Sequence, residues 1–159
     1  MHSATLCLIR NGDNLLLAMK KRGFGVGKWN GVGGKPEVTD KDIAATAFRE
    51  TKEEIGVEIE DFKKVAVLRF TFPYKDQKAD WDQDVHVYLA TSWKGEPKET
   101  EEMKPQWFNI SNLPYQEMWD DDKLWLPHVL AGKKVNAEFV FEEGEIINNH
   151  IINFVEQLA

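Results

Sequence analysis

The chain has 159 residues, 42% of them hydrophobic and 30% charged, which is the composition of a soluble globular protein with one domain, residues 1–159. Its net charge of −7 argues against a nucleic-acid duplex as partner, because phosphate backbones bind basic surfaces, whereas a metal ion and a few lysines still allow a nucleotide. No stretch predicts a membrane span, and we expect neither a signal peptide nor a membrane partner. The single cysteine, Cys7, cannot form an internal disulfide and predicts a reduced, cytoplasmic protein.

Two apolar runs, 4–9 and 15–19, are separated by the turn-forming sequence NGDN and predict a β-hairpin. Thr5 is the polar residue of the first run. It is either a ligand contact or a threonine that simply suits a pleated strand.

A basic, glycine-rich segment, KKRGFGVGKWNG, covers residues 20–31. The backbone N–H groups of such a loop can approach phosphate, although its spacing matches neither a P-loop nor the dinucleotide-binding fingerprint. The alternative is a flexible surface loop that carries aromatic residues. Residues 29–34 then predict a short strand, and we expect the turn after it to present backbone carbonyls near the helix that follows.

A helix is predicted from Asp40 to Ile55, with Asp40 as its N-cap and Asp42 favourably placed in its first turn. Its apolar stripe consists of Ile43, Ala44, Ala47 and Phe48. Gly56 is placed to end the helix, since glycine adopts the left-handed conformation that terminates many helices.

Three carboxylates of this helix, Glu50, Glu53 and Glu54, share one face, because residues three and four positions apart are neighbours. Their mutual repulsion requires compensation. Water can screen them on a solvated acidic helix, Arg49 and Lys52 can balance them, or a hard divalent cation can bind among them.

The second half of the chain alternates between strands and turns. Strands are predicted within 57–72, at 85–89, at 106–110 and at 139–141, with loops or turns at 73–84, 96–102, 111–114 and Gly144. Residues 124–130 have helical spacing, whereas 146–158 suit either a strand or a helix.

Polar groups in this half have two interpretations each. His86, between valines, is either a ligand or a satisfied structural residue. Glu101 and Glu102 belong to a solvated acidic loop or bring another carboxylate to a metal. The aspartates of 120–122 either charge the start of a helix or enter a binding pocket.

The sequence RETKEEIGV, residues 49–57, resembles the second half of the Nudix hydrolase signature, G-x5-E-x7-R-E-U-x-E-E-x-G-U, in which U is aliphatic. Thr51 departs from it by taking an aliphatic position. The upstream glutamate of the signature falls on Lys41, and Gly34 lies one residue too far away, as if the turn held an insertion. The resemblance implies that Asp40 or Asp42 takes over this acidic, structural role.

Other segments resemble one branch of the family, the MutT homologues that hydrolyse oxidised purine nucleoside triphosphates. These segments are KKRGFGxGxWNGxGGK, DVHV, EEMxPxWF and MWxDDxxWxP. The resemblance implies an α/β fold, the Nudix α/β/α sandwich with a central mixed β-sheet.

The resemblance also implies the site residues. The carbonyl of Gly33 would bind metal with Glu50, Glu53, Glu54 and Glu102, the same four glutamates being the catalytic candidates. Substrate would be bound by Thr5, Lys20, Phe24, Asn30, Gly34, Lys35, Phe70, Phe72, Met103, Trp119, Asp121, Asp122 and Trp125. Glu53 is our first choice as general base and Glu102 the second.

Three departures from this branch lie near the expected base pocket. Gln83 replaces a pocket methionine, the loop 73–82 is longer and brings in Trp81, and Asp120 replaces a proline. These departures therefore bear on the identity of the substrate more than on any other property that the resemblance implies.

We expect a monomeric enzyme that uses Mg2+, or alternatively Mn2+, and takes a small nucleotide as substrate. It would convert oxidised purine nucleoside triphosphates, such as 8-oxo-dGTP and 2-hydroxy-dATP, to the monophosphate and pyrophosphate. The alternatives are a Nudix enzyme acting on a nucleotide sugar, a dinucleotide or capped RNA, and a nucleotide-binding module without activity. Because Asp121 and Asp122 are adjacent, burial of both side chains would raise the pKa of at least one of them. The protonated aspartate could then donate a hydrogen bond to a purine, while its neighbour accepts one from it.

Overall fold

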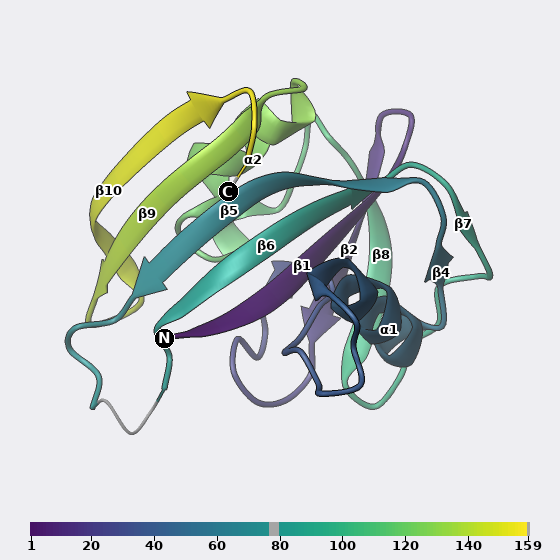
Figure 1. Ribbon diagram of the computed structural model, residues 1–159, viewed down its shortest axis with the longest axis horizontal. Coiled ribbons are helices and arrows are strands. Elements are labelled where there is room, and N and C mark those ends of the chain that lie inside the picture. Colours follow the sequence, from purple (N-terminus) through teal and green to yellow (C-terminus); the bar gives the residue numbers. More distant parts are fainter. Residues whose placement is uncertain (77–79, 159) are drawn as a thin grey trace.

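The computed structural model describes residues 1–76 and 80–158. Its elements are β1 (His2–Asn11), β2 (Asn14–Lys20), β3 (Trp29–Asn30), α1 (Ile43–Ile55), β4 (Glu58–Ile59), β5 (Phe62–Thr71), β6 (Gln83–Ala90), β7 (Trp93–Lys94), β8 (Met103–Asn109), the short 3-10 helix η2 (Tyr115–Glu117), α2 (Asp122–Leu130), β9 (Lys134–Glu142) and β10 (Ile146–Val155). In this described part, eight strands form a sheet with the order β10-β9-β5-β6-β1-β2-β3 and β8 paired to β2 (Figure 1). The sheet is mixed, as expected, because β1 and β6 run parallel, as do β5 and β9.

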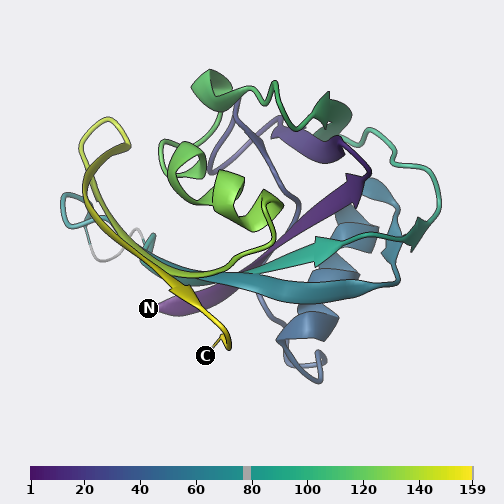
Figure 2. The ribbon, with the colours of Figure 1, turned by 90° about the horizontal axis from the view of Figure 1, so that it is seen from above.

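The two helices cover opposite faces of the sheet (Figure 2). On the α2 face, Trp125 and Leu126 of the helix pack with Leu8, Leu68 and Phe139 of the strands in the larger core. On the α1 face, a smaller core joins Ile55 and its neighbours to the alternate residues of β1 and β2. This layering follows from the period-two alternation of strand side chains, and it confirms the predicted α/β class with a central mixed sheet.

The predicted N-terminal hairpin is confirmed. Asn11 pairs with Asn14 across a two-residue turn of Gly12 and Asp13. Gly12 has a φ of 60°, the positive value that such tight hairpin turns require and that glycine adopts without steric cost.

Helix α1 ends at Gly56 as predicted, but it begins later than the sequence suggested. The helix starts at Ile43, and its N-cap is Asp42, whose side chain accepts a hydrogen bond from the Ala45 amide. The prediction that Asp40 is the N-cap is therefore wrong. Gly56 has the left-handed conformation, and its amide donates to the carbonyl of Lys52.

The later elements agree with their predicted types. Strands occupy the predicted segments within 57–72, 85–89 and 139–141 and residues 106–109 of the predicted strand 106–110, and α2 contains the predicted helix 124–130. The ambiguous segment after Gly144 is the strand β10. In the expected loop 73–84, residues 77–79 lie outside the described residues, and Gln83 and Asp84 already belong to β6.

Within the described residues, no helix combines the length and hydropathy needed to cross a membrane. Cys7 is buried at 1% exposure, and burial raises the pKa of its thiol to about 12. The thiol is therefore a neutral core group, as its position in an apolar run suggested.

Candidate active site

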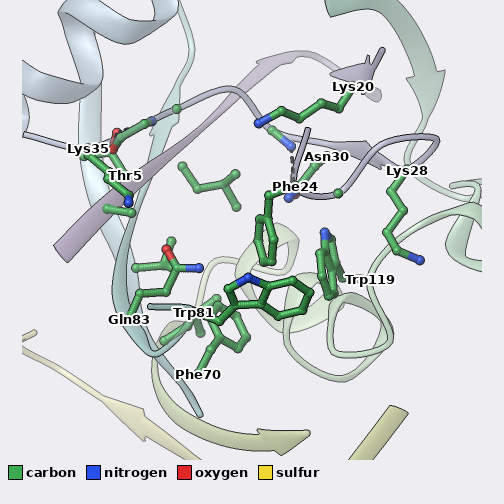
Figure 3. Close-up of a pocket in the computed structure, with 18 of the residues that line it drawn as sticks. Thr5, Lys20, Phe24, Lys28, Asn30, Lys35, Phe70, Trp81, Gln83 and Trp119 are labelled. Atoms are coloured by element: carbon green, nitrogen blue, oxygen red, sulfur yellow. Dashed lines mark hydrogen bonds between the residues drawn. The ribbon is translucent and has the colours of Figure 1, made fainter. Parts of the chain in front are cut away.

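A cavity of about 440 Å³ opens on the α2 face of the sheet and reaches the N-terminal loops and the carboxylate helix α1. Its walls bring together most of the predicted site residues, with aromatic side chains at one end and Lys20 and Lys35 away from them (Figure 3). The predicted residues that line it are Thr5, Lys20, Phe24, Asn30, Gly33, Gly34, Lys35, Glu50, Glu54, Phe70, Phe72, Met103, Trp119, Asp121, Asp122 and Trp125.

Two predicted residues do not line the cavity. The side chain of Glu53 is 57% exposed and accepts a hydrogen bond from Arg49 at 3.1 Å. Glu102 accepts one from Arg22 at 3.0 Å. Glu102 nevertheless lies close enough to Glu54 for its charge to help raise the pKa of that residue, so it borders the carboxylate end.

Arg49 organises the carboxylate end. Its guanidinium donates to both oxygens of Asp40, Nε to Oδ1 at 2.9 Å and Nη2 to Oδ2 at 3.0 Å, and Nη1 donates to Glu50 at 2.9 Å. Asp40 also accepts from the amide of Glu37 and the hydroxyl of Thr46. These bonds, led by that from Arg49, hold the pKa of Asp40 well below its usual range.

Asp40 therefore supplies the acidic, structural anchor that the family signature places at the position of Lys41. The same Arg49 donates through Nη2 to the carbonyl of Lys35 at 3.0 Å and so ties the preceding turn to the helix. Of the two candidates for this anchor, Asp40 and Asp42, the structure assigns Asp40, and Asp42 caps the helix instead.

The carboxyl groups of Glu50 and Glu54 are partly buried at the cavity wall. Burial raises the pKa of both, although the Arg49 guanidinium opposes the shift at Glu50. The nearby charges of Glu102 and Glu50 raise the pKa of Glu54 further. This end of the cavity thus holds negative charge that is incompletely compensated by the protein.

Two glycines allow the turn to approach these carboxylates and strand β1. A Cβ atom on Gly34 would lie 2.4 Å from the carboxyl carbon of Glu50, and one on Gly33 would lie 1.8 Å from the carbonyl oxygen of Thr5. The Thr5 amide donates to the Gly34 carbonyl at 2.9 Å, and its hydroxyl accepts from the Gly34 amide at 3.3 Å. Thr5 is thus a cavity residue that also fixes the glycine turn.

The donor chemistry of this end suits a hard divalent cation, although the present orientation of the side chains does not. Glu50 and Glu54 offer carboxylate oxygens, and a cation beside them would relieve their repulsion. Within the described residues, no three acidic, histidine or cysteine side chains already converge as metal ligands do. Arg49 bonds one oxygen of Glu50 and one oxygen of Glu53, so the second oxygen of each carboxylate carries no bond from Arg49.

At the other end of the cavity, Asp121 and Asp122 are buried at 2% and 3% exposure. Asp121 accepts a hydrogen bond from the indole N–H of Trp125 at 2.7 Å, whereas Oδ2 of Asp122 has no partner within the described residues. Burial raises the pKa of Asp121 to about 6, and burial together with the charge of Asp121 raises the pKa of Asp122 well above its usual range. Asp122 therefore holds its proton the more tightly.

These observations decide between the two interpretations of the aspartates of 120–122. Asp121 occupies the N-cap position of α2 but makes no side-chain capping bond, so the pair does not serve as a solvated helix cap. Asp120 is different, because it binds Lys123 at 2.8 Å and the amide of Ile147 at 2.9 Å. Only the buried pair belongs to the cavity.

Aromatic rings form the walls around the aspartates. The ring of Phe24 lies 5.1 Å from that of Trp119 and 4.6 Å from that of Trp81, and Phe72 lies 4.9 Å from Phe141. Asn30 accepts a hydrogen bond from the amide of Gly31 at 2.9 Å through its side-chain oxygen, which leaves its NH2 group as a donor.

Sequence reasoning missed several lining residues. Lys28 lines the cavity and places its ammonium group 5.3 Å from the centre of the Trp119 ring, and Leu68 and Phe141 come from the floor strands. Trp81 and Gln83 were noticed only as departures from the family branch. Alternation along β5, β6 and β9 could have indicated Leu68, Gln83 and Phe141. His86, by contrast, contacts Lys64 at 3.0 Å and is not a cavity residue.

A family model described as NUDIX domain matches residues 1–129. Similar proteins include the oxidized purine nucleoside triphosphate hydrolases of Danio rerio, 41% identical over 154 residues, and Mus musculus, 38% identical over 152 residues. These alignments cover 97% and 96% of this chain, and 96% and 94% of the relatives.

Among solved structures, the MutT protein of Bacillus halodurans is similar with a TM-score of 0.82 and 23% identity, covering 96% of this chain and 98% of that chain. This likeness concerns the fold. The family match and the two relatives, together with the carboxylate helix and its glycine turn, place this chain in the NUDIX family of hydrolases.

Proposed function

We propose that this protein hydrolyses oxidised purine nucleoside triphosphates, such as 8-oxo-dGTP and 2-hydroxy-dATP, to the monophosphate and pyrophosphate, and so removes them from the nucleotide pool. The observation that carries this proposal is a single cavity with the buried pair Asp121 and Asp122 at one end and carboxylates of the Nudix helix at the other. The names of the relatives from Danio rerio and Mus musculus support the same substrate class.

The buried aspartates suit a purine because they offer both hydrogen-bonding roles. A protonated Asp122 donates, while Asp121 accepts once it is ionised. The NH2 group of Asn30 adds a donor, and the rings of Phe24 and Trp119 supply apolar walls for a planar base. A change in which aspartate carries the proton would let one pocket accept more than one oxidised purine.

The carboxylate end suits the triphosphate. Lys20 and Lys35 line the cavity there and would bind phosphate oxygens. Glu50, Glu53, Glu54 and Glu102, with the carbonyl of Gly33, would hold Mg2+ or Mn2+, which neutralises phosphate charge and lowers the pKa of the attacking water. A glutamate would accept a proton from that water while the water oxygen attacks phosphorus. The anhydride bond then breaks, which leaves the monophosphate and pyrophosphate.

Glu53 and Glu54 are both candidates for this proton acceptor. Glu53 is the choice from the sequence, whereas Glu54 has the position in the cavity wall and the raised pKa that general bases often show. We also propose that the protein is a monomer and acts in the cytoplasm. The free, buried Cys7 supports this compartment, because cytoplasmic proteins keep their thiols reduced.

A substrate panel tests the proposal. We expect kcat/KM with Mg2+ to be highest for 8-oxo-dGTP or 2-hydroxy-dATP, lower for dGTP, and lower again for a nucleotide sugar, a dinucleotide and capped RNA. Chelation by EDTA should abolish pyrophosphate release, and added Mg2+ should restore it. A preference for any of the last three substrates would indicate another Nudix activity, and binding without pyrophosphate release at saturating Mg2+ would indicate a nucleotide-binding module.

A further inference from the structure

Two segments that lie far apart in sequence form the base end of the cavity. One is the glycine-rich loop with strand β3, which carries Phe24, Lys28 and Asn30, and the other carries Trp119 and the aspartate pair. Figure 3 shows Phe24 and Asn30 from the first segment and Trp119 from the second. A base that contacts both segments is recognised only if the protein fixes the distance between them.

A hydrogen bond between Trp29 and Glu117 joins the two segments. The indole N–H of Trp29 donates to the carboxylate of Glu117 at 3.1 Å, across 88 positions of the chain. Trp29 directly precedes Asn30, and Glu117 stands two residues before Trp119. Neither Trp29 nor Glu117 lines the cavity, so the bond supports the pocket without offering a contact to its ligand.

The tryptophan side of this bond is firmly held. Trp29 is 7% exposed, its ring packs edge-on against that of Phe108 at 4.9 Å, and its backbone pairs with Met19 of β2. Because β3 consists of Trp29 and Asn30 alone, a contact that fixes Trp29 also fixes the backbone of Asn30.

The glutamate side of the bond is continuous with the other half of the pocket. Glu117 is the last residue of η2, and its amide donates to the carbonyl of Pro114 at 2.8 Å. Met118 follows at 5% exposure, and the Trp119 carbonyl accepts a hydrogen bond from the Asp122 amide at 3.1 Å. Since successive turns are closed in this way, a displacement of Glu117 is passed on to Trp119 and the aspartate pair.

Two further contacts between the segments are less directional. The ring of Phe24 lies 5.1 Å from that of Trp119, and the ammonium group of Lys28 lies 5.3 Å from the centre of the same ring. All three side chains line the cavity, so an entering base can alter both contacts. The bond from Trp29 to Glu117 has a charged acceptor and a fixed direction, and a base inside the cavity does not compete for it.

We propose that Glu117 is a positioning residue for base recognition, which acts by holding Trp29 and so sets the distance of Asn30 from Trp119 and the aspartate pair. Without this bond the two segments shift relative to each other, and the pocket discriminates less well between purines. This inference rests on the proposed function, because it assumes that the base is bound between these segments.

The selectivity between 8-oxo-dGTP and dGTP tests this role. Glu117→Met removes the acceptor, whereas Glu117→Gln removes the charge but keeps an oxygen that can accept the indole N–H. Trp29→Phe removes the donor of the same bond. Gln116→Met is the matched control, since Gln116 is the exposed neighbour of Glu117 in η2 and also lies outside the cavity. Thermal melting verifies that each variant is folded.

For Glu117→Met we expect KM for 8-oxo-dGTP to rise about three- to tenfold with kcat nearly unchanged. The ratio of kcat/KM for 8-oxo-dGTP to that for dGTP should fall by a similar factor, because dGTP gains less from the pocket. A purely structural role would instead lower the fraction of folded enzyme, and with it kcat for both substrates alike, and would leave KM and this ratio unchanged.

Two comparisons assign the effect to the hydrogen bond. Glu117→Gln should keep the ratio within about twofold of the wild type, because the bond can still form. The double variant Trp29→Phe/Glu117→Met should lose no more selectivity than Glu117→Met alone, since both changes break one bond. An unchanged ratio in Glu117→Met, an equal loss in Glu117→Gln or Gln116→Met, or additive losses in the double variant would overturn the inference.

Dissociation constants of 8-oxo-dGMP and dGMP, measured without turnover, separate this inference from the proposed function. If the wild type hydrolyses neither triphosphate, the proposed function fails, and the ratio of these constants in wild type and Glu117→Met still decides whether Glu117 positions the pocket. If the wild type prefers 8-oxo-dGTP and Glu117→Met keeps that preference, only the inference fails. A wild type that distinguishes the two bases in neither measurement would overturn both.

Discussion

The two ends of the cavity treat the same functional group in opposite ways. At α1, the carboxyl groups of Glu50 and Glu53 are paired with Arg49, which is itself held by Asp40. At the start of α2, Asp121 and Asp122 are buried, and within the described residues no lysine or arginine forms an ion pair with either. Arg49 therefore offsets part of the negative charge at one end, whereas at the other end burial keeps a proton on Asp122.

This difference matches the two parts of a nucleotide. Phosphates and a divalent cation bring many charges, so the end that meets them needs ionised groups that can exchange partners. A purine is uncharged and offers donors and acceptors, so the end that meets it needs a carboxyl group that can donate. The predictions below test whether charge at one end and protonation at the other are separable properties.

The largest expected effect is the loss of turnover at the carboxylate end. Glu54→Gln should lower kcat by about 10²- to 10⁴-fold, whether Glu54 is the base or a metal ligand. Because Glu54 is repelled by Glu102 and Glu50, its neutralisation should leave the melting temperature unchanged or raise it. Glu53→Gln should lower kcat by a comparable factor if Glu53 binds the metal.

Steady-state kinetics and thermal melting measure both properties, with Glu58→Gln as the control. Glu58 is a partly exposed carboxylate that pairs with Lys52 at 2.9 Å and does not line the cavity. Near-normal turnover in Glu54→Gln would remove this residue from the catalytic set, and the same result for Glu53→Gln would contradict the choice made from the sequence.

Much of the carboxylate end could be predicted because its residues are local in sequence. The spacing of Glu50, Glu53 and Glu54 on one helix and the terminating Gly56 are fixed by helix geometry alone. The sequence could not show that Arg49 already binds two of these carboxylates, or which aspartate anchors it. That choice depends on how the residues between Gly34 and Ile43 fold back, which has no periodic signal.

The base end was less predictable because it is assembled from distant segments. The adjacent aspartates and Trp119 were visible, but their burial depends on β9 and on the loop before β6. The resemblance to known enzymes supplied Asn30 and Phe72 for this pocket, whereas periodicity supplied only the type of each strand. Gln83 could be placed at the cavity only when its pairing with His2 and Phe70 was known.

The second prediction concerns the glycine turn that positions the carboxylate end. Gly34→Ala places a methyl group against Glu50 and should displace that side chain, lowering kcat/KM by about ten- to a hundredfold with the fold preserved. Gly33→Ala would instead meet the backbone of β1 at Thr5, which cannot move aside, and should lower the melting temperature strongly. Equal behaviour of the two variants in kinetics and melting would contradict this division.

The third prediction concerns specificity at the base end. Asp121→Asn and Asp122→Asn should each change the ranking of 8-oxo-dGTP, 2-hydroxy-dATP and dGTP, with shifts of about tenfold or more in the ratio of two kcat/KM values. An amide cannot exchange a proton between donor and acceptor roles as a carboxyl pair does. Asp120→Asn is the control, because Asp120 binds Lys123 and Ile147 outside the pair. An unchanged ranking in both variants would remove the pair from base recognition.

The smallest expected effect is on the pH dependence of stability, to which the buried aspartate pair and Asp40 should contribute with opposite signs. The pKa of Asp121 is raised to about 6 from an ordinary value of 3.8, so between these values the folded protein binds a proton that the unfolded chain has released. Stability therefore falls as the pH rises through this window, by at most about 1.4 kcal/mol per pH unit for each proton. The pKa of Asp40 is lowered, so its contribution is present above pH 3.8 and is lost as the pH falls below it.

Urea unfolding at half-unit intervals from pH 3 to pH 8 can separate the two signs. The double variant Asp121→Asn/Asp122→Asn should lose stability less steeply than the wild type between pH 4 and pH 6, because it no longer releases these protons. Asp40→Asn should flatten only the loss below pH 4, where Asp40 is protonated as the protein unfolds. If the double variant kept the wild-type slope between pH 4 and pH 6, the buried pair would not be storing a proton, and the contrast between the two ends would lose its electrostatic basis.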